Sequence, residues 1–154
     1  MTVDPYGPWT GTQMDEADVD ALLTSTGWGV LSLAADDEPY SIPISFGYDG
    51  TDVYFGFLRA GESNRKSEFV ADGTTARLLV TDIRARFDWQ SIAVTGPLRA
   101  VDWQSDGWET LVDCLESNPW FASQFPDADD VEGIRGWRLD PDAVHGVEVR
   151  PEQG

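Results

Sequence analysis

The sequence has little cysteine, histidine or lysine: each occurs once among 154 residues. A single cysteine, Cys114, excludes an intramolecular disulfide, and its place on the apolar side of a predicted helix indicates a small buried side chain. Together with the one histidine, His145, it supplies too few ligands for a structural zinc site. The two residues lie far apart in the sequence and give no support to nucleophile–base catalysis of acyl transfer.

Long hydrophobic segments are also missing. No apolar run approaches the ~20 residues that a membrane-spanning helix needs. The opening residues, MTVDPYGPWTGTQ, contain neither the basic nor the apolar region of a secretion signal. These absences predict a cytoplasmic protein without a membrane partner.

Positive charge is scarce as well. The chain carries 28 acidic residues against ten Lys or Arg, which gives a net charge of −18. Such a surface repels nucleic-acid phosphates and anionic lipids, so neither is an expected partner. Because salt screens self-repulsion, the composition predicts a protein of a halophile, adapted to a salty cytosol. An ordinary acidic protein is the alternative interpretation.

The hydrophobic pattern predicts one mostly β domain over residues 14–154, preceded by a loose tail at residues 1–13. Strands are predicted at 29–35, 40–48, 53–58, 75–83, 91–102, 134–141 and 142–149, and short helices at 14–26, 61–73 and 107–117. Pro43 cannot donate a ladder hydrogen bond, so its strand should have an open or bulged side. Gly96-Pro97 is expected to break the strand at 91–102. Short sequential strands favour an antiparallel barrel or sandwich.

The scarce positive charge is concentrated in one segment, RAGESNRKSEF at residues 59–69. Arg65 and the only lysine, Lys66, fall in the first turn of the helix predicted at 61–73. Unpaired N–H groups and the positive end of the helix dipole favour an anion at such a position. The segment therefore predicts a phosphate site. A solvated helix face, with Arg65 paired to Glu62 or Glu68, is the alternative.

Three other stretches offer a place for the body of a ligand. Pro43 and Gly56 lie in strands where the backbone is left free or a ring can approach closely. Trp89, Gln90 and Ser91 add an apolar wall with amide and hydroxyl donors at the start of a strand. This combination suits a flat heterocycle, although ordinary core packing is the simpler explanation for any one of these residues alone.

The succession YSIPISFGYDGTDVYFGF, NRKSEF, ARLLVTD and WQSIAVTGPLRAVD resembles the pyridoxamine 5′-phosphate oxidase-like flavin-binding split-barrel family over residues 14–104. Its smaller members, including the nitroimidazole-resistance type, look most similar. The resemblance implies an antiparallel, Greek-key-like split β-barrel that forms a homodimer. It also implies FMN in a groove between the two barrels.

The resemblance assigns cofactor contacts to one basic segment and three strand segments. Arg65, Lys66 and Ser67 match the residues that bind the FMN phosphate. The strand segments that match residues along the flavin are Pro43, Ile44 and Ser45, then Gly56, Phe57 and Leu58, and finally the polar pair Gln90 and Ser91. No catalytic acid or base, and no metal site, is assigned.

The activity that the resemblance implies is FMN-dependent oxidoreduction of the flavin reductase type, with hydride taken from a nicotinamide and passed to a small molecule. The C-terminus, HGVEVRPEQG, does not place the Arg and His with which the oxidase proper grips its substrate, which argues against pyridoxamine-phosphate oxidation. A deazaflavin-dependent reductase is one alternative. A non-catalytic flavin or haem carrier is another, with His145 as a haem ligand or, more simply, a structural residue.

Overall fold

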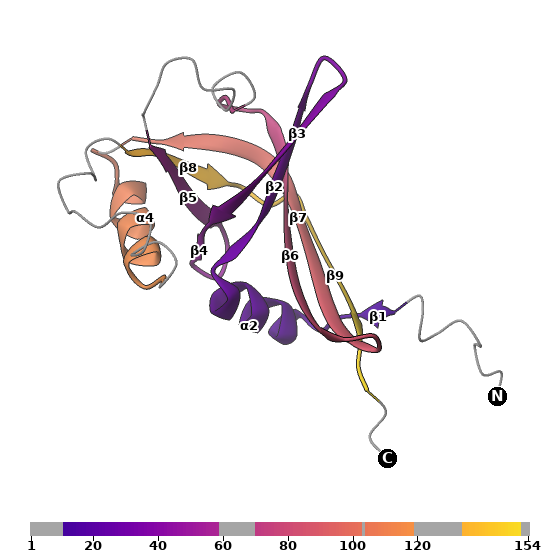
Figure 1. The fold of residues 1–154 in the computed structure, drawn as a ribbon. Coiled ribbons are helices and arrows are strands. Elements are labelled where there is room, and N and C mark those ends of the chain that lie inside the picture. Colours follow the sequence, from indigo (N-terminus) through magenta and orange to yellow (C-terminus); the bar gives the residue numbers. More distant parts are fainter. Residues whose placement is uncertain (1–10, 59–69, 103, 119–133, 152–154) are drawn as a thin grey trace.

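The computed structural model describes residues 11–58, 70–102, 104–118 and 134–151, drawn in colour in Figure 1. These residues form two helices, α2 (Glu16–Thr26) and α4 (Asp106–Glu116), and nine strands. The strands are β1 (Thr12–Gln13), β2 (Trp28–Ala35), β3 (Glu38–Ser45), β4 (Gly47–Tyr48), β5 (Val53–Leu58), β6 (Thr75–Ala85), β7 (Asp88–Val101), β8 (Ile134–Leu139) and β9 (Ala143–Val149).

Helix α2 ends where the sequence predicts and begins two residues later, at Glu16 instead of Met14. Acidic residues occupy its first turn, where the helix dipole favours them. Gly27 ends it in the left-handed conformation, with φ of 73°, which glycine adopts without steric cost. Its apolar side, Val19, Leu22 and Leu23, is buried against one end of the barrel.

The strands follow the order β3-β2-β6-β7-β8-β5-β4, with β9 beside β7 and β1 beside β9. Every pairing is antiparallel. The chain passes from β3 into β4, which pairs with β5, and β3 contacts β5, so the curved sheet closes on itself. Fully buried side chains from β2, β5, β6, β7 and β8 fill its interior, among them Leu31, Phe55, Leu78, Ile92 and Leu139.

Strand β7 corrects one prediction. The sequence predicts a break at Gly96-Pro97, but the strand runs on from Asp88 to Val101. What changes there is the partner: residues up to Thr95 pair with β9, and residues from Leu98 pair with β8. Because proline has no N–H, Pro97 suits the place where one partner leaves and the next begins.

Strand β3 confirms the expectation for Pro43. It is the terminal strand in the order of the sheet, and Pro43 is paired on one side only, with Val30 of β2. The missing N–H therefore costs no ladder bond, and it blunts an edge that could otherwise pair with another chain. The predicted turn at Asp49-Gly50 is also present, with the Asp49 carboxylate accepting from the N–H groups of Thr51 and Asp52 at 2.8 and 2.7 Å.

Other predictions differ from the structure or lie outside the described residues. The tail predicted at residues 1–13 ends in a paired strand, because Thr12 and Gln13 lie opposite Glu148 and Val147 of β9. The single strand predicted at 40–48 is divided into β3 and β4. The helix predicted at 61–73 falls largely on residues outside the described ranges.

Candidate functional site

The barrel has two outer faces, and α4 covers one of them. Leu111 and Leu115 of α4 pack on Tyr54 of β5, with Val101 of β7 beside them. The helix lies so close that a Cβ added at Gly47 would meet the Cys114 backbone at 2.9 Å, and one added at Gly136 would meet Leu111 at 2.8 Å. We call this surface of β4, β5, β8 and the end of β7 the covered face.

The second outer face has no such cover among the described residues. It runs across β3, β2, β6, the first half of β7 and β9, and we call it the open face. Its residues form rows that run across neighbouring strands, and each residue in a row pairs with the next. The rows are Ser41–Ser32–Arg77–Thr95–Ala143, Pro43–Val30–Leu79–Ala93–His145, Ser45–Trp28, Thr81–Ser91–Val147 and Ile83–Trp89–Val149. Side-chain bonds between Ser32 and Ser41 (3.0 Å) and from Arg77 to Thr95 (3.1 Å) agree with this register.

The open face contains no Asp or Glu, although 28 of the 154 residues are acidic. It also exposes large apolar side chains: Trp28 is 44% exposed, Leu79 39% and Ile83 73%. An exposed apolar patch of this kind marks an interaction or ligand surface. In these rows, exposed apolar side chains therefore lie together without negative charge.

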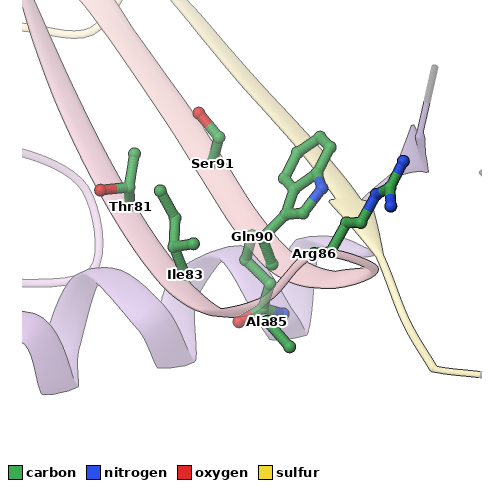
Figure 2. Close-up of a pocket in the computed structure, with 7 residues that line it drawn as sticks. Thr81, Ile83, Ala85, Arg86, Gln90 and Ser91 are labelled. Atoms are coloured by element: carbon green, nitrogen blue, oxygen red, sulfur yellow. The ribbon is translucent and has the colours of Figure 1, made fainter. Parts of the chain in front are cut away.

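A cavity of about 340 Å³ lies on the open face beside the turn between β6 and β7. Figure 2 shows that Thr81 and Ile83 of β6 and Ser91 of β7 line it from neighbouring strands, and that Arg86 extends from the turn. Trp89 supplies an aromatic wall. Apolar surface with a few hydroxyl and amide groups is the composition of a small-molecule site.

The residues predicted on β3 divide between the two sides of the sheet. Pro43 and Ser45 belong to the open face, although Ser45 is only 8% exposed, whereas the Ile44 side chain is buried in the core. Ile44 therefore has only its backbone to offer a ligand. Ser91 lies on the same face as Pro43 and Ser45, three strands away, which is about 14 Å at the usual strand spacing.

The Gln90 side chain bonds on the other side of the sheet from Ser91, although Gln90 also lines the cavity beside the turn. Its amide nitrogen donates to a carboxylate oxygen of Glu148 at 3.0 Å, directly across from β7 to β9. Sequence reasoning missed Glu148, which is 7% exposed and also binds Arg150 at 2.9 Å. Glu148 is 58 residues from Gln90 in the sequence, so no local pattern links the two. Glu148 can be identified only when the pairing of β9 with β7 is known, because that pairing places its side chain beside Gln90.

Gly56, Phe57 and Leu58 lie on β5, opposite Gly136, Arg135 and Ile134 of β8. Since β3 contacts β5, this segment and the Pro43–Ser45 segment belong to adjoining parts of the barrel. The structure thus brings two predicted segments together and sets Gln90–Ser91 apart from both. Arg65, Lys66 and Ser67, the predicted phosphate residues, lie outside the described residues.

Two further polar groups lie near the covered face. Burial, more than its neighbours, raises the pKa of Asp52, and the Nε atom of Arg138 is buried without a hydrogen-bond partner in the described part of the chain. Burial also raises the pKa of the Cys114 thiol, as expected for a cysteine that packs beside an apolar cluster. Among the residues described, no group of three His, Cys, Asp or Glu is placed to hold a metal ion.

Comparison with known proteins decides the family. A sequence model described as pyridoxamine 5′-phosphate oxidase matches residues 15–148, which is most of the chain. The chain belongs to the pyridoxamine 5′-phosphate oxidase family. No curated protein matches its sequence at a significant level.

Solved structures show the fold. An FAD-binding protein from Mesorhizobium loti superposes with a TM-score of 0.70 at 18% identity, covering 88% of this chain and 95% of that one. An FAD-binding protein from Mycobacterium smegmatis gives a TM-score of 0.69 at 19% identity, covering 92% and 100%. An FAD- and haem-binding protein from the same organism gives 0.65 at 16%, covering 94% and 77%.

The fold predicted for this family member is confirmed: it is a mostly antiparallel split β-barrel with short helices. In the part of the chain that the structure describes, no helix is long and apolar enough to cross a membrane.

Proposed function

We propose that this protein binds FMN on the open face, in a groove completed by a second copy of the chain, and that it acts as an oxidoreductase. Its hydride donor would be a nicotinamide and its acceptor a small molecule. The observation that carries the proposal is the acid-free, apolar open face, to which Pro43, Ser45 and Ser91 belong.

The open face fits a flavin for two reasons. A flat ring system needs apolar walls, which Trp28, Leu79 and Ile83 provide. A phosphorylated cofactor needs a surface free of carboxylates, and the open face is such a surface on a chain of net charge −18. Arg65 and Lys66 remain the predicted phosphate ligands, with Ser67 beside them.

A second copy completes the groove. An outer barrel face is one wall, and a flat ligand in a cleft needs two. The open face can pair with itself without bringing carboxylates together, which suits a two-fold, self-complementary interface. Trp28 and Trp89 place aromatic side chains within that interface, as interfaces favour.

The residues of the chain would hold the cofactor and shape its groove, and the cofactor would supply the redox chemistry. Hydride transfer is what a bound flavin supplies. The apolar walls and the second copy would exclude water from the reacting atoms, and the hydroxyls of Thr81 and Ser91 would orient polar ring edges. Glu148 holds the Gln90 amide at 3.0 Å on the opposite side of β7.

The absorption spectrum of the purified protein tests the cofactor. We expect flavin bands at about 450 nm, whereas a band at about 420 nm would indicate deazaflavin and a sharp Soret band would indicate haem. Chromatography of the released cofactor separates FMN from FAD. Oxidation of a reduced nicotinamide by the loaded protein then separates an enzyme from a carrier.

Lys66→Ala tests the phosphate site. Removing a charge-assisted hydrogen bond typically costs about 1.5–3 kcal/mol, which lowers FMN affinity roughly tenfold to a hundredfold. Riboflavin lacks the phosphate, so its affinity should not change. Equal weakening of both ligands would instead assign Lys66 to the fold or the ring.

We also propose that the protein works in a salty cytoplasm. At a net charge of −18, salt should stabilise the folded state by screening repulsion. The melting temperature should rise between low and molar KCl, and a flat response would identify an ordinary acidic protein.

A further inference from the structure

We propose that the cavity at the β6–β7 turn binds a flat aromatic anion and that Arg86 selects its negative charge. This inference rests on the proposed function, because the ligand would be the donor or acceptor that meets the flavin on the open face. The cavity begins at Ser91, on the flavin side, and extends along β6 and β7 to Arg86 at the turn.

The size and walls of the cavity fit a small ring compound. Its volume of about 340 Å³ lies at the lower end of ligand pockets, which is typical of one or two rings. Ile83, 73% exposed, and the half-buried Trp89 lie opposite each other across β6 and β7, so a ring has apolar surface to contact on both strands. Aromatic stacking on Trp89 would favour flat ligands over saturated ones.

Of the two cavities beside the turn, only one is lined by acidic side chains. Asp82 and Asp88 line a neighbouring cavity of about 310 Å³, together with Arg84 and Arg150. That cavity shares Trp89 and Gln90 with the one proposed here, but neither carboxylate lines the proposed cavity. Arg84 is neutralised on that side by Asp82, at 3.1 Å. The lining of the proposed cavity contains no Asp or Glu.

Arg86 keeps its charge. Among the described residues it forms no ion pair, and its guanidinium lies 5.1 Å from the centre of the Phe87 ring. A cation over an aromatic face is held in place without being neutralised. It can therefore still receive a carboxylate or a similar anion at the turn, while Thr81 and Ser91 offer hydroxyls at the other end.

The overall charge of the protein predicts the opposite preference. A net charge of −18 attracts cations and repels anions over the whole surface. An anion preference at this cavity must therefore come from local groups. Whether the cavity prefers an anion or a cation therefore tests the proposal directly.

The test uses protein reconstituted with FMN and three probes of one shape: 4-fluorobenzoate, 4-fluorobenzamide and 4-fluorobenzylamine. Their dissociation constants are measured by fluorine NMR titration at one fixed salt concentration. We expect the anion to bind about tenfold more tightly than the cation, with the neutral amide between them. Equal binding, or tighter binding of the cation, would overturn the inference.

Arg86→Gln and Arg84→Gln form a matched pair. Each removes one positive charge in or beside the same turn, so each changes the net charge equally. Arg86→Gln should weaken 4-fluorobenzoate about threefold to fivefold, the upper part of the range for an exposed ion pair, and leave 4-fluorobenzamide unchanged. Arg84→Gln should change neither probe by more than about twofold. Equal losses in the two variants would show a general field effect and reject Arg86 as the selecting residue.

The flavin spectrum separates the two proposals. If flavin binds but the anion preference is missing, the inference about the cavity fails alone. If the preference for 4-fluorobenzoate and its dependence on Arg86 persist in protein that binds no flavin, the cavity is confirmed and the proposed flavin function fails.

Discussion

The covered face and the open face belong to one barrel and share strand β7, yet their outer surfaces differ. Beyond Leu98, β7 pairs with β8, and α4 buries the outer surface of β5 and its neighbours under Leu111 and Leu115. Before Thr95 the same strand pairs with β9, and the outer surface keeps Leu79 and Ile83 exposed. Apolar surface on the outside of a barrel needs to be buried. Among the described residues, a helix of the same chain buries it on the covered face only.

The two faces differ in the residues that lie on them. Covering a face with a helix requires small residues beneath it, and Gly47 and Gly136 meet that need. Leaving a face for a partner requires the absence of repelling charge, and the open face meets that need by having no carboxylate. Different substitutions should therefore disrupt the proposed dimer contact on the open face and the helix packing on the covered face.

The largest effect is expected from placing an acid on the open face. Leu79→Glu would bring two carboxylates together across a two-fold interface, and like charges in contact cost several kcal/mol. We expect the dimer to dissociate, while the monomer stays folded because Leu79 is already 39% exposed. Light scattering measures the mass, and circular dichroism measures the fold.

Val144→Glu is the matched control for that substitution. Val144 is 48% exposed and apolar, but it lies opposite Val94, which points into the core, and so it is not part of the open face. The added charge is the same, and the dimer should persist. A dimer that survives Leu79→Glu as well would show that the copies meet elsewhere.

The next effect breaks the covered face. Gly47→Val would place side-chain atoms against the Cys114 backbone, which an added Cβ already meets at 2.9 Å. Overpacking of this kind costs about 3 kcal/mol, measured as a lower free energy of unfolding in urea. Gly107→Ala, where the nearest atom is an ordinary 3.5 Å away, should cost nothing. If both variants are equally stable, α4 does not pack as closely as described.

A smaller loss is expected where α4 is tied to the barrel. The Asn118 amide, 5% exposed, donates to the carbonyls of Gly27 and Phe46 at 2.6 and 2.7 Å. Asn118→Ala would leave buried carbonyls without these donors and should cost about 2 kcal/mol in unfolding free energy. Ser117→Ala, which removes an exposed bond to Asp113, should cost under about 0.5 kcal/mol. Equal losses of unfolding free energy in the two variants would show that the Asn118 hydrogen bonds do not hold α4 against the barrel.

Local chemistry made much of this fold predictable from sequence. Gly27 ends α2, Asp49-Gly50 turns the chain, and Pro43 marks an edge, because each acts through its own backbone. The course of β7 was not predictable from Gly96-Pro97, since proline there marks a change of partner, and the partners β8 and β9 come later in the chain.

The candidate site was predictable in part. Ser91 and Pro43 were singled out by type, and their common face follows once strands are paired. The absence of acid along alternate positions of β2, β6 and β7 was visible in the sequence, but it gains meaning only when the register places those positions side by side. The contact between Gln90 and Glu148 had no local signal, because a cross-strand pair depends on which strands meet.

The smallest effect concerns Tyr48, at the border of the covered face. Burial, then the hydrogen bond to Asp20 at 2.7 Å, raises the pKa of Tyr48 from 10.0 to about 12. A folded-state pKa above the unfolded value means that this stabilisation is complete below pH 10 and is lost as the pH rises through about 12. Tyr48→Phe removes the ionisable group, so between these pH values the variant should lose stability less steeply than the parent. At neutral pH it should be less stable by about 0.5 kcal/mol, the low end for a partly exposed hydrogen bond. Urea unfolding at several pH values checks both statements, and parallel pH profiles for the two proteins would show that Tyr48 titrates as it does in the unfolded chain.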